Sequence, residues 1–209
     1  MMDLTQPQWV RHTVLHPFEG FEDLRWKKAG SLKYAAVIVA ALFVALIAYD
    51  RWCGFQFRPL PDQLFSILPY LTRSVVYFAA WVLGNWAVCT LLDGEGTMKN
   101  ICIYSAYALI PYIVSVFVNV LLSHILVRAE MVFFTTVSYV GLIWTGLLLF
   151  NAVKAVHQYS IAKTAAAIAL TVFAMLVILF LGVLVLSLFQ KVYVFFYSLY
   201  TEILYRVRV

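Results

Sequence analysis

Five apolar stretches make up most of this 209-residue chain, and none carries a charged residue near its centre. They are Leu32–Tyr49, Ser74–Leu92, Ile101–Val127, Met131–Phe150 and Thr164–Phe189. A hydrocarbon core about 30 Å thick is crossed by about 20 residues of helix, so each stretch is long enough to span a bilayer. The pattern therefore predicts an all-α integral membrane bundle of five transmembrane helices.

The composition agrees with a single membrane-embedded domain. Hydrophobic residues make up 64% of the chain and charged residues 12%, whereas soluble domains average about 45–50% and 25%. We divide the chain into a cytoplasmic N-terminal segment (residues 1–31), a transmembrane domain (residues 32–190) and a short amphipathic C-terminal tail (residues 191–209).

The basic residues predict the orientation in the membrane. The net charge is +5, but Lys and Arg gather beside the span ends, where they meet lipid headgroups, so nucleic-acid binding is not expected. The cluster before and at the start of the first span consists of Arg11, Arg25, Lys27, Lys28 and Lys33. By the positive-inside rule the N-terminus lies in the cytoplasm, and five spans then place the C-terminus outside the cell membrane.

Three flanking segments have an interfacial composition. Phe18–Lys28 mixes aromatic and charged residues, which is typical of a helix lying in the headgroup plane. Phe55–Pro69 contains three prolines and is too broken to span. Lys191–Val209 fits either an amphipathic surface helix or an extension of the fifth span, because Glu202 and Arg206 leave too few apolar residues for a sixth crossing.

A few polar residues lie inside the spans. Ser115, Asn119 and Ser123 recur every four residues and share one face of the third span, and Asn85 is a lone amide in the second. We favour hydrogen bonds between helices, worth about 0.6 kcal/mol each, as their role. The alternative is a small-solute channel or carrier that uses these polar faces. Pro111 predicts a kink that frees a backbone carbonyl one turn earlier.

The sequence contains no recognisable catalytic or metal-binding motif. His12 and His16 have the spacing of metal ligands on a helix, but Pro17 disfavours helical geometry at His16 and no third ligand is near. His124 and His157 fall at opposite ends of the spans. A His–Ser dyad between distant spans is the one catalytic arrangement that the spacing leaves open. We therefore expect a protein that is not an enzyme and that uses no metal or cofactor.

Three separated motifs resemble one known family. They are Thr90–Thr97 leading into Tyr104–Tyr112, His16–Leu24 and His157–Ser160. In this order they resemble the Yip family of Ypt/Rab-interacting membrane proteins, and its bacterial branch in particular, over nearly the whole chain from His16 onward. The resemblance implies five helices, a cytoplasmic N-terminus and a short C-terminus outside.

The resemblance implies less about function. Eukaryotic members bind prenylated small GTPases, but their hydrophilic N-terminal region is much shortened here, so a small GTPase is not the expected partner. Bacterial members are often encoded beside ABC transporters for sugars, which suggests an accessory or scaffold subunit. The expected partners are the lipid bilayer and other membrane proteins, with ABC transporter subunits as the suggested example. The oligomeric state stays open.

The partner-binding surface is predicted on the cytoplasmic side, where the five-span topology gathers the pre-span segment and two loops. Loops held by a rigid bundle often carry recognition. The residues assigned to this surface are Phe18, Glu19, Phe21, Asp93, Gly94, Glu95, Gly96, His157, Gln158 and Tyr159. The alternative interpretation is that the glycines only satisfy turn geometry and the aromatic residues only anchor helices at the interface.

Overall fold

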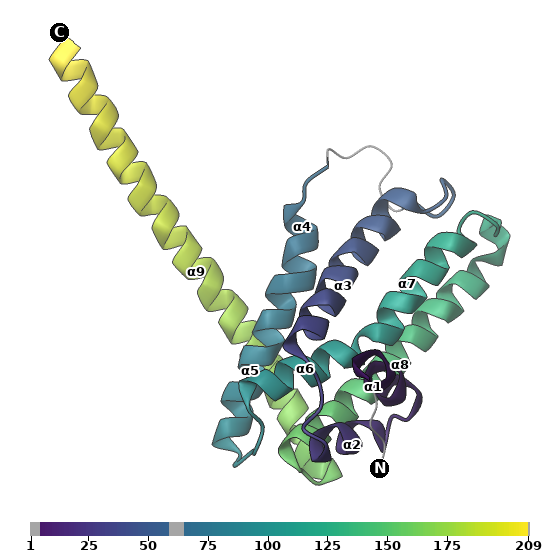
Figure 1. Cartoon of the computed structure of the whole chain (residues 1–209). Helices are drawn as coiled ribbons and strands as arrows, with labels where there is room; N and C mark the ends of the chain where they lie inside the picture. Colours follow the sequence, from purple (N-terminus) through teal and green to yellow (C-terminus); the bar gives the residue numbers. More distant parts are fainter. Residues whose placement is uncertain (1–4, 59–64, 209) are drawn as a thin grey trace.

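The computed structural model of the chain describes residues 5–58 and 65–208, and within these residues it contains helices and no strand (Figure 1). Five helical stretches are long and apolar enough to cross a membrane. They are Leu32–Trp52, Leu68–Leu91, Met98–Leu122, Arg128–His157 and Ile161–Arg206. The predicted all-α membrane bundle with five spans is therefore confirmed.

The first two spans differ in regularity. The first is the single helix α3 (Leu32–Trp52), whereas the second runs from α4 (Leu68–Leu71) through the π-helical turn η1 (Thr72–Val76) into α5 (Tyr77–Leu91). The second span begins before the predicted start because proline is tolerated in the first turn of a helix, where Pro69 lies. The prolines at positions 59 and 61 lie outside the described residues.

The third span is broken near Pro111, as predicted. A single residue, Leu109, separates the end of α6 (Met98–Ala108) from the start of α7 (Ile110–Leu122). The break leaves the backbone N–H of Tyr112 free to donate to Thr145 Oγ1 on the fourth span, at 3.0 Å. A neighbouring helix thus satisfies a backbone group that the broken helix leaves unpaired, which is how membrane proteins tolerate proline in a span.

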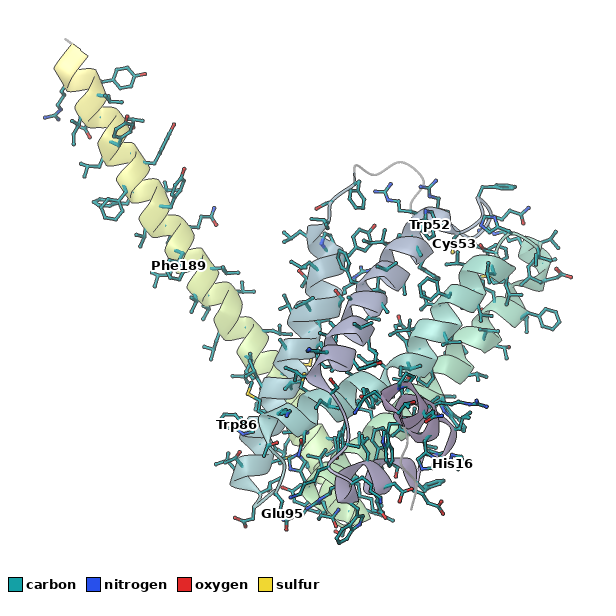
Figure 2. All side chains as sticks on the ribbon, in the orientation of Figure 1. His16, Trp52, Cys53, Trp86, Glu95 and Phe189 are labelled. Carbon is teal, nitrogen blue, oxygen red and sulfur yellow. The ribbon has the colours of Figure 1, made fainter. Side chains whose placement is uncertain are left out.

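The last two spans are longer than predicted. After the short turn η2 (Arg128–Glu130), helix α8 runs from Met131 to His157, and α9 runs without interruption from Ile161 to Arg208. At 1.5 Å per residue, α9 is about 70 Å long, more than twice the hydrocarbon thickness. The C-terminal tail therefore continues the fifth span as one helix. Its second half, which carries Phe189, projects away from the other helices (Figures 1 and 2).

Close packing of the spans occurs at glycines. A Cβ atom on Gly141 of α8 would lie 2.2 Å from Ser115 Oγ on α7. A Cβ on Gly84 of α5 would lie 3.3 Å from the carbonyl oxygen of Thr171 on α9. The absence of a side chain at these glycines lets the helix backbones approach closely. Such close packing stabilises the pairs α7–α8 and α5–α9 in a bilayer, where the hydrophobic effect does not drive helices together.

The N-terminal segment forms two short helices that dock on one end of the bundle (Figure 1). These are α1 (Gln6–Leu15) and α2 (Gly20–Trp26). Phe21 and Leu24 of α2 are fully buried, and the ring of Phe21 lies 5.9 Å from that of Tyr104 on α6. The helical structure agrees with the prediction for Phe18–Lys28, but the apolar face of α2 packs on protein rather than on lipid.

Candidate functional site

Three segments that are distant in sequence meet at the end of the bundle that carries α1 and α2. They are the segment before the first span, the loop Asp93–Thr97 between α5 and α6, and the α8–α9 turn around His157 (Figure 1). We call this region the N-terminal junction. Ion pairs and hydrogen bonds join the three segments there.

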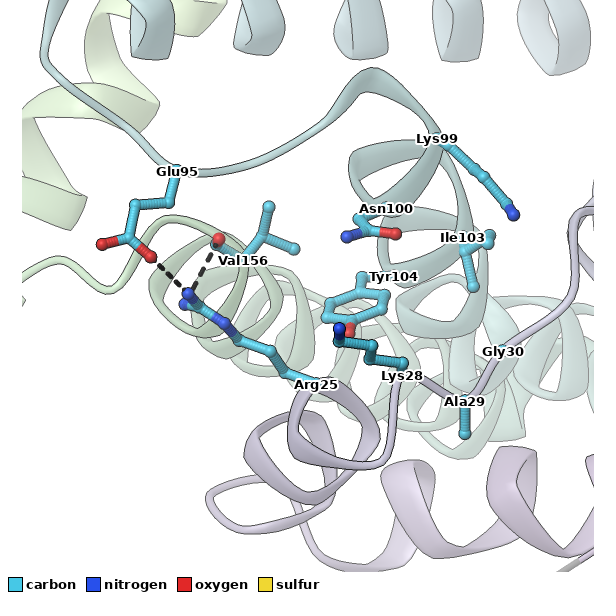
Figure 3. A pocket seen from close by; sticks show the side chains of 10 residues that line it. All are labelled: Arg25, Lys28, Ala29, Gly30, Glu95, Lys99, Asn100, Ile103, Tyr104 and Val156. Carbon is cyan, nitrogen blue, oxygen red and sulfur yellow. Dashed lines mark hydrogen bonds and ion pairs between the residues drawn. The ribbon is translucent and has the colours of Figure 1, made fainter.

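Arg25 connects all three segments of the junction. Its guanidinium donates to the backbone carbonyl of Ala155 at 2.8 Å, near the C-terminus of α8. It also pairs with the carboxylate of Glu95 in the loop, and Figure 3 draws this pair together with a longer bond to the carbonyl of Val156. A second ion pair joins Glu22 of α2 to Lys154 of α8. A cation at a helix C-terminus also compensates the partial negative charge there.

His157 begins a chain of hydrogen bonds that runs into the bundle. Its Nδ1 accepts from the backbone N–H of Gly96 at 3.3 Å, and its Nε2 lies 3.0 Å from Asn85 Oδ1. Asn85 Nδ2 donates to Thr171 Oγ1, which donates in turn to the carbonyl of Ala167. His157, Asn85 and Thr171 are buried, so the chain joins α8, α5 and α9 in a region of low dielectric.

The two glycines of the loop are required for space. A Cβ on Gly94 would lie 2.5 Å from His157 Nδ1, and a Cβ on Gly96 would lie 2.4 Å from a methyl carbon of Val156. The residue with the left-handed backbone is Asp93, at φ +56°, not a glycine. The loop then closes by a bond from Gly94 N–H to the carbonyl of Cys89, which is typical of a helix C-cap.

Tyr159 closes the C-terminus of α5. Its hydroxyl lies 3.1 Å from the carbonyl oxygens of both Cys89 and Leu92, and its ring stacks on His157 at 5.3 Å between centroids. Desolvation raises the pKa of Tyr159 to about 12. The hydroxyl therefore keeps the proton that it donates to these carbonyls.

A cavity of about 320 Å³ opens beside Arg25 (Figure 3). Three cationic side chains line it, from Arg25, Lys28 and Lys99, together with Asn100 and Tyr104. The acid in the lining, Glu95, is the ion-pair partner of Arg25. The cavity thus has an excess of positive charge and of hydrogen-bond donors, which suits an anionic group.

The residues assigned to the predicted surface fall into two groups. Exposed ones are Phe18, Glu19, Asp93, Glu95 and Gln158. Buried ones are Phe21, His157 and Tyr159, and the two glycines are partly buried. His157 is the last residue of α8 rather than a loop residue as expected, and its contacts are internal. Any partner contact at this surface therefore belongs to the exposed group.

Sequence reasoning missed part of the cavity. Lys99, Asn100 and Tyr104 were not assigned to it, although all three lie in the first two turns of α6, directly after the loop. Their spacing was the available signal, because Asn100 and Tyr104 are one turn apart on the same helix face. The partner of that face, Lys28, comes from a segment about 70 residues away, which no local pattern reveals.

The polar residues of the second and third spans do not lie along one path. Asn85 belongs to the His157 chain, whereas Ser123, at the far end of α7, accepts from the backbone N–H of Gly54 at 2.8 Å. Ser115 donates to the carbonyl of Tyr112, and Asn119 donates to Ser138 Oγ on α8. Asn85 and Asn119 therefore make the interhelical hydrogen bonds that we favoured, whereas the bond described for Ser115 is within its own helix. The oxygen of the Asn119 amide has no partner among the described residues.

His12 and His16 lie closer together than expected. Their ring centroids are 4.7 Å apart, although His16 has left the helix, with φ −119° and ψ 77°. His12 Nε2 lies 2.9 Å from the carboxylate of Asp23. Within residues 5–58 and 65–208, no group of three or more His, Cys, Asp or Glu side chains is placed to hold a metal ion.

The comparisons with known proteins identify the family. The family model described as the Yip1 domain matches residues 11–186, which is most of the chain. Comparisons with curated proteins and with solved structures gave no match. The matched range includes α2, the loop Asp93–Thr97 and the His157 turn, so it covers all three segments of the N-terminal junction. The chain therefore belongs to the Yip1-domain family of membrane proteins.

Proposed function

We propose that this protein is a non-enzymatic accessory or scaffold subunit of the cell membrane, and that it binds other membrane proteins through the N-terminal junction. One observation carries the proposal: the junction holds exposed residues from three segments on a rigid base. Arg25 and the His157 chain fix that base by hydrogen bonds that cross between helices. Rigid presentation of exposed residues lowers the entropic cost of binding.

The exposed basic and aromatic side chains of the junction support a protein partner with an acidic group. The cavity beside Arg25 presents Lys28 and Lys99, whose side chains form no ion pair among the described residues. Phe18 and Trp26, 68% and 82% exposed, add apolar anchors on the same N-terminal segment as Arg25 and Lys28. Aromatic and cationic groups together are typical of binding hot spots. ABC transporter subunits, which the family resemblance suggests, are the first partners to test.

The test is capture of partners from native membranes in mild detergent by a tagged chain that carries Lys99→Glu. Lys99 is exposed in the first turn of α6, where an acidic side chain is favourable to the helix dipole, so the change reverses charge in the cavity without weakening the helix. The matched control is Lys191→Glu on the exposed part of α9. We expect Lys99→Glu to reduce capture and Lys191→Glu to leave it unchanged. Equal capture by both variants would contradict the proposal.

A channel or carrier is the second candidate, and a cavity of about 510 Å³ between the spans, lined in part by Asp50, Arg73 and Asn119, favours it. Polar groups left open inside a span are often part of a solute path. The test is flux of ions and small solutes into liposomes that contain the purified chain. Flux that is lost on Asn119→Leu would support a carrier and overturn the scaffold proposal. Absence of flux with both the unsubstituted chain and Asn119→Leu would support the scaffold function over the carrier.

A further inference from the structure

The C-terminal half of α9 carries an apolar face that no other part of the described structure covers. Residues 180–200 are exposed throughout, and this half projects away from the other spans (Figures 1 and 2). A Cβ atom on Gly182 would meet nothing within 4 Å. Neither glycine nor proline follows Gly182 in the sequence, and the helix is unbroken to Arg208. Because sharp bends in helices occur mainly at such residues, α9 stays straight and does not fold back along the membrane surface.

The last turns of α9 extend beyond the bilayer on the side opposite the N-terminal junction. Lys163 and Lys191 flank a stretch without charged residues and are 28 positions apart. This separation corresponds to about 42 Å of helix, and a bilayer with its headgroup regions is about 40–45 Å thick. The two lysines therefore lie at the two membrane surfaces. Lipid covers the apolar side chains between them, whereas those that follow Lys191 lie outside the lipid.

The uncovered face has the spacing of a seam between paired helices. Glycine, aliphatic and aromatic residues recur on it at alternating intervals of four and three positions, at Gly182, Leu186, Phe189, Tyr193, Phe196, Tyr200 and Ile203. We call this row the α9 seam. Its six side chains after Gly182 are 52–69% exposed. An apolar repeat that averages 3.5 residues is the pattern of two helices that pair along their length.

The charged residues of the same segment lie off the α9 seam. Lys191 and Ser198 are seven positions apart and occupy the side of the helix opposite the seam. Arg206 donates to the carboxylate of Glu202 in its own helix at 2.7 Å. Copies of one chain insert with the same orientation, so a second α9 stands parallel at the same height and each seam residue meets its own counterpart. An uncharged seam is self-complementary in this arrangement, whereas a charged seam would repel itself.

The α9 seam also offers enough surface for a stable contact. A standard interface buries about 800 Å² on each partner, and one aromatic side chain buries about 150–250 Å². The four aromatic residues of the seam are 61–69% exposed, so they supply roughly half of that area, and the aliphatic residues on and beside the seam add to it.

We propose that the α9 seam pairs in parallel with the α9 seam of a second copy of this chain. The segment after Lys191 continues the helix of the span, and the second copy covers the apolar face that lipid does not reach. The contact has two-fold symmetry, because the same surface is used on both partners. This inference does not depend on the partner proposed for the N-terminal junction, which lies at the other end of the bundle.

Two adjacent phenylalanines provide a matched test. Phe196 lies on the seam and is 61% exposed, whereas Phe195, 63% exposed, lies about 100° around the helix from it. The experiment counts chains per spot by single-molecule photobleaching of the labelled full-length protein in liposomes, over a range of protein densities. We expect the unsubstituted chain and Phe195→Lys to form pairs. Phe196→Lys should raise the dissociation constant about tenfold or more at an unchanged melting temperature, because an aromatic pair is lost and two like charges meet.

Cysteine crosslinking tests the register of the pair. Single cysteines replace one seam residue at a time, as Tyr193→Cys, Phe196→Cys or Tyr200→Cys, with Ser198→Cys on the opposite side as the control, and the unsubstituted chain measures the background. In oxidised membranes we expect linked pairs of the chain from the three seam variants and not from Ser198→Cys.

Four results overturn the proposal. The first is a chain that stays monomeric at every density, and the second is equal weakening by Phe195→Lys and Phe196→Lys. The third is a seam cysteine that links to a different protein, which would make that protein the partner. The fourth is a monomeric chain in which lipid shields Phe196→Cys from a soluble thiol reagent, because the membrane surface would then cover the seam.

Discussion

His157 can hold only one ring proton where it lies. Because Nδ1 accepts from the Gly96 amide, the proton must be on Nε2, which donates to Asn85 Oδ1. A second proton would place two donors, His157 Nδ1–H and Gly96 N–H, face to face. The neutral imidazole is therefore the form that the fold requires, and its role at the junction is to connect helices.

The same geometry predicts the effect of a single methyl group. Gly96→Ala places a Cβ 2.5 Å from His157 Cε1 and closer still to Val156, so the loop or the ring must move and the hydrogen bond from Gly96 is lost. We expect a loss of about 1–3 kcal/mol in the free energy of unfolding, measured by thermal or denaturant unfolding in detergent. Gly146→Ala, where the new Cβ meets nothing within 4 Å, is the control and should be neutral or stabilising. Equal melting temperatures for the two variants would contradict this account.

The pair of His157 and Asn85 should also behave as one unit. In a double-mutant cycle of Asn85→Ala and His157→Ala, removing either residue leaves one buried polar atom of the other without its partner, so the second change costs less than it does alone. We expect a coupling free energy of about 1–2 kcal/mol, measured by unfolding in the same detergent. Additive losses from the two changes would show that the contact stabilises nothing.

At the scale of elements, α9 has two halves with different roles. The first half packs on α5 through Gly84 and Thr171, whereas residues 180–200 are exposed throughout. Because lipid solvates an apolar helix as well as another helix does, the exposed half needs no protein contact to stay helical. The bundle should therefore depend on the first half alone.

Deletion of residues 190–209 tests this division. The shortened α9, Ile161–Phe189, is still long enough to cross the hydrocarbon core. We expect the truncated chain to reach the membrane at normal abundance and to keep its melting temperature. The contrasting variant is Thr171→Val, which removes the acceptor of Asn85 and should lower stability by about 0.6 kcal/mol or more. A truncated chain that is less stable than Thr171→Val would mean that the far half carries contacts essential to the fold.

At the scale of the whole molecule, the spans could be predicted from the sequence and the ends of the spans could not. Apolar length alone identifies all five crossings, and the break at Pro111 follows from the missing N–H of proline. Helix α8 continues to His157 because two residues from other segments provide hydrogen-bond partners at its end. Arg25 donates to the backbone carbonyl of Ala155 in the last turn, and Asn85 bonds to the side chain of His157. Such contacts join residues 72 and 130 positions apart, and no local pattern contains them. The burial of Phe21 was missed for the same reason.

The orientation of the molecule is the last prediction, and it follows from the gathering of three segments at one end. Arg25 pairs with Glu95 and bonds to Ala155, so the N-terminus, the Asp93–Thr97 loop and the His157 turn lie on one side of the membrane. By the positive-inside rule, the basic cluster around the start of α3 predicts that this side faces the cytoplasm. Single cysteines can be placed at exposed positions on each side, at Trp26 and Gln158 for the near side and at Phe55 for the far side.

An impermeant thiol reagent added to intact cells should label Phe55→Cys and should reach Trp26→Cys and Gln158→Cys only after the cells are opened. The three native thiols, at Cys53, Cys89 and Cys102, are buried or partly buried and give a low background, which the unsubstituted chain measures. Labelling of Trp26→Cys and Gln158→Cys from outside, with Phe55→Cys protected, would invert the orientation while keeping the fold. Labelling of Trp26→Cys and Gln158→Cys from opposite sides would contradict the N-terminal junction itself, because one set of hydrogen bonds cannot join two sides of a bilayer.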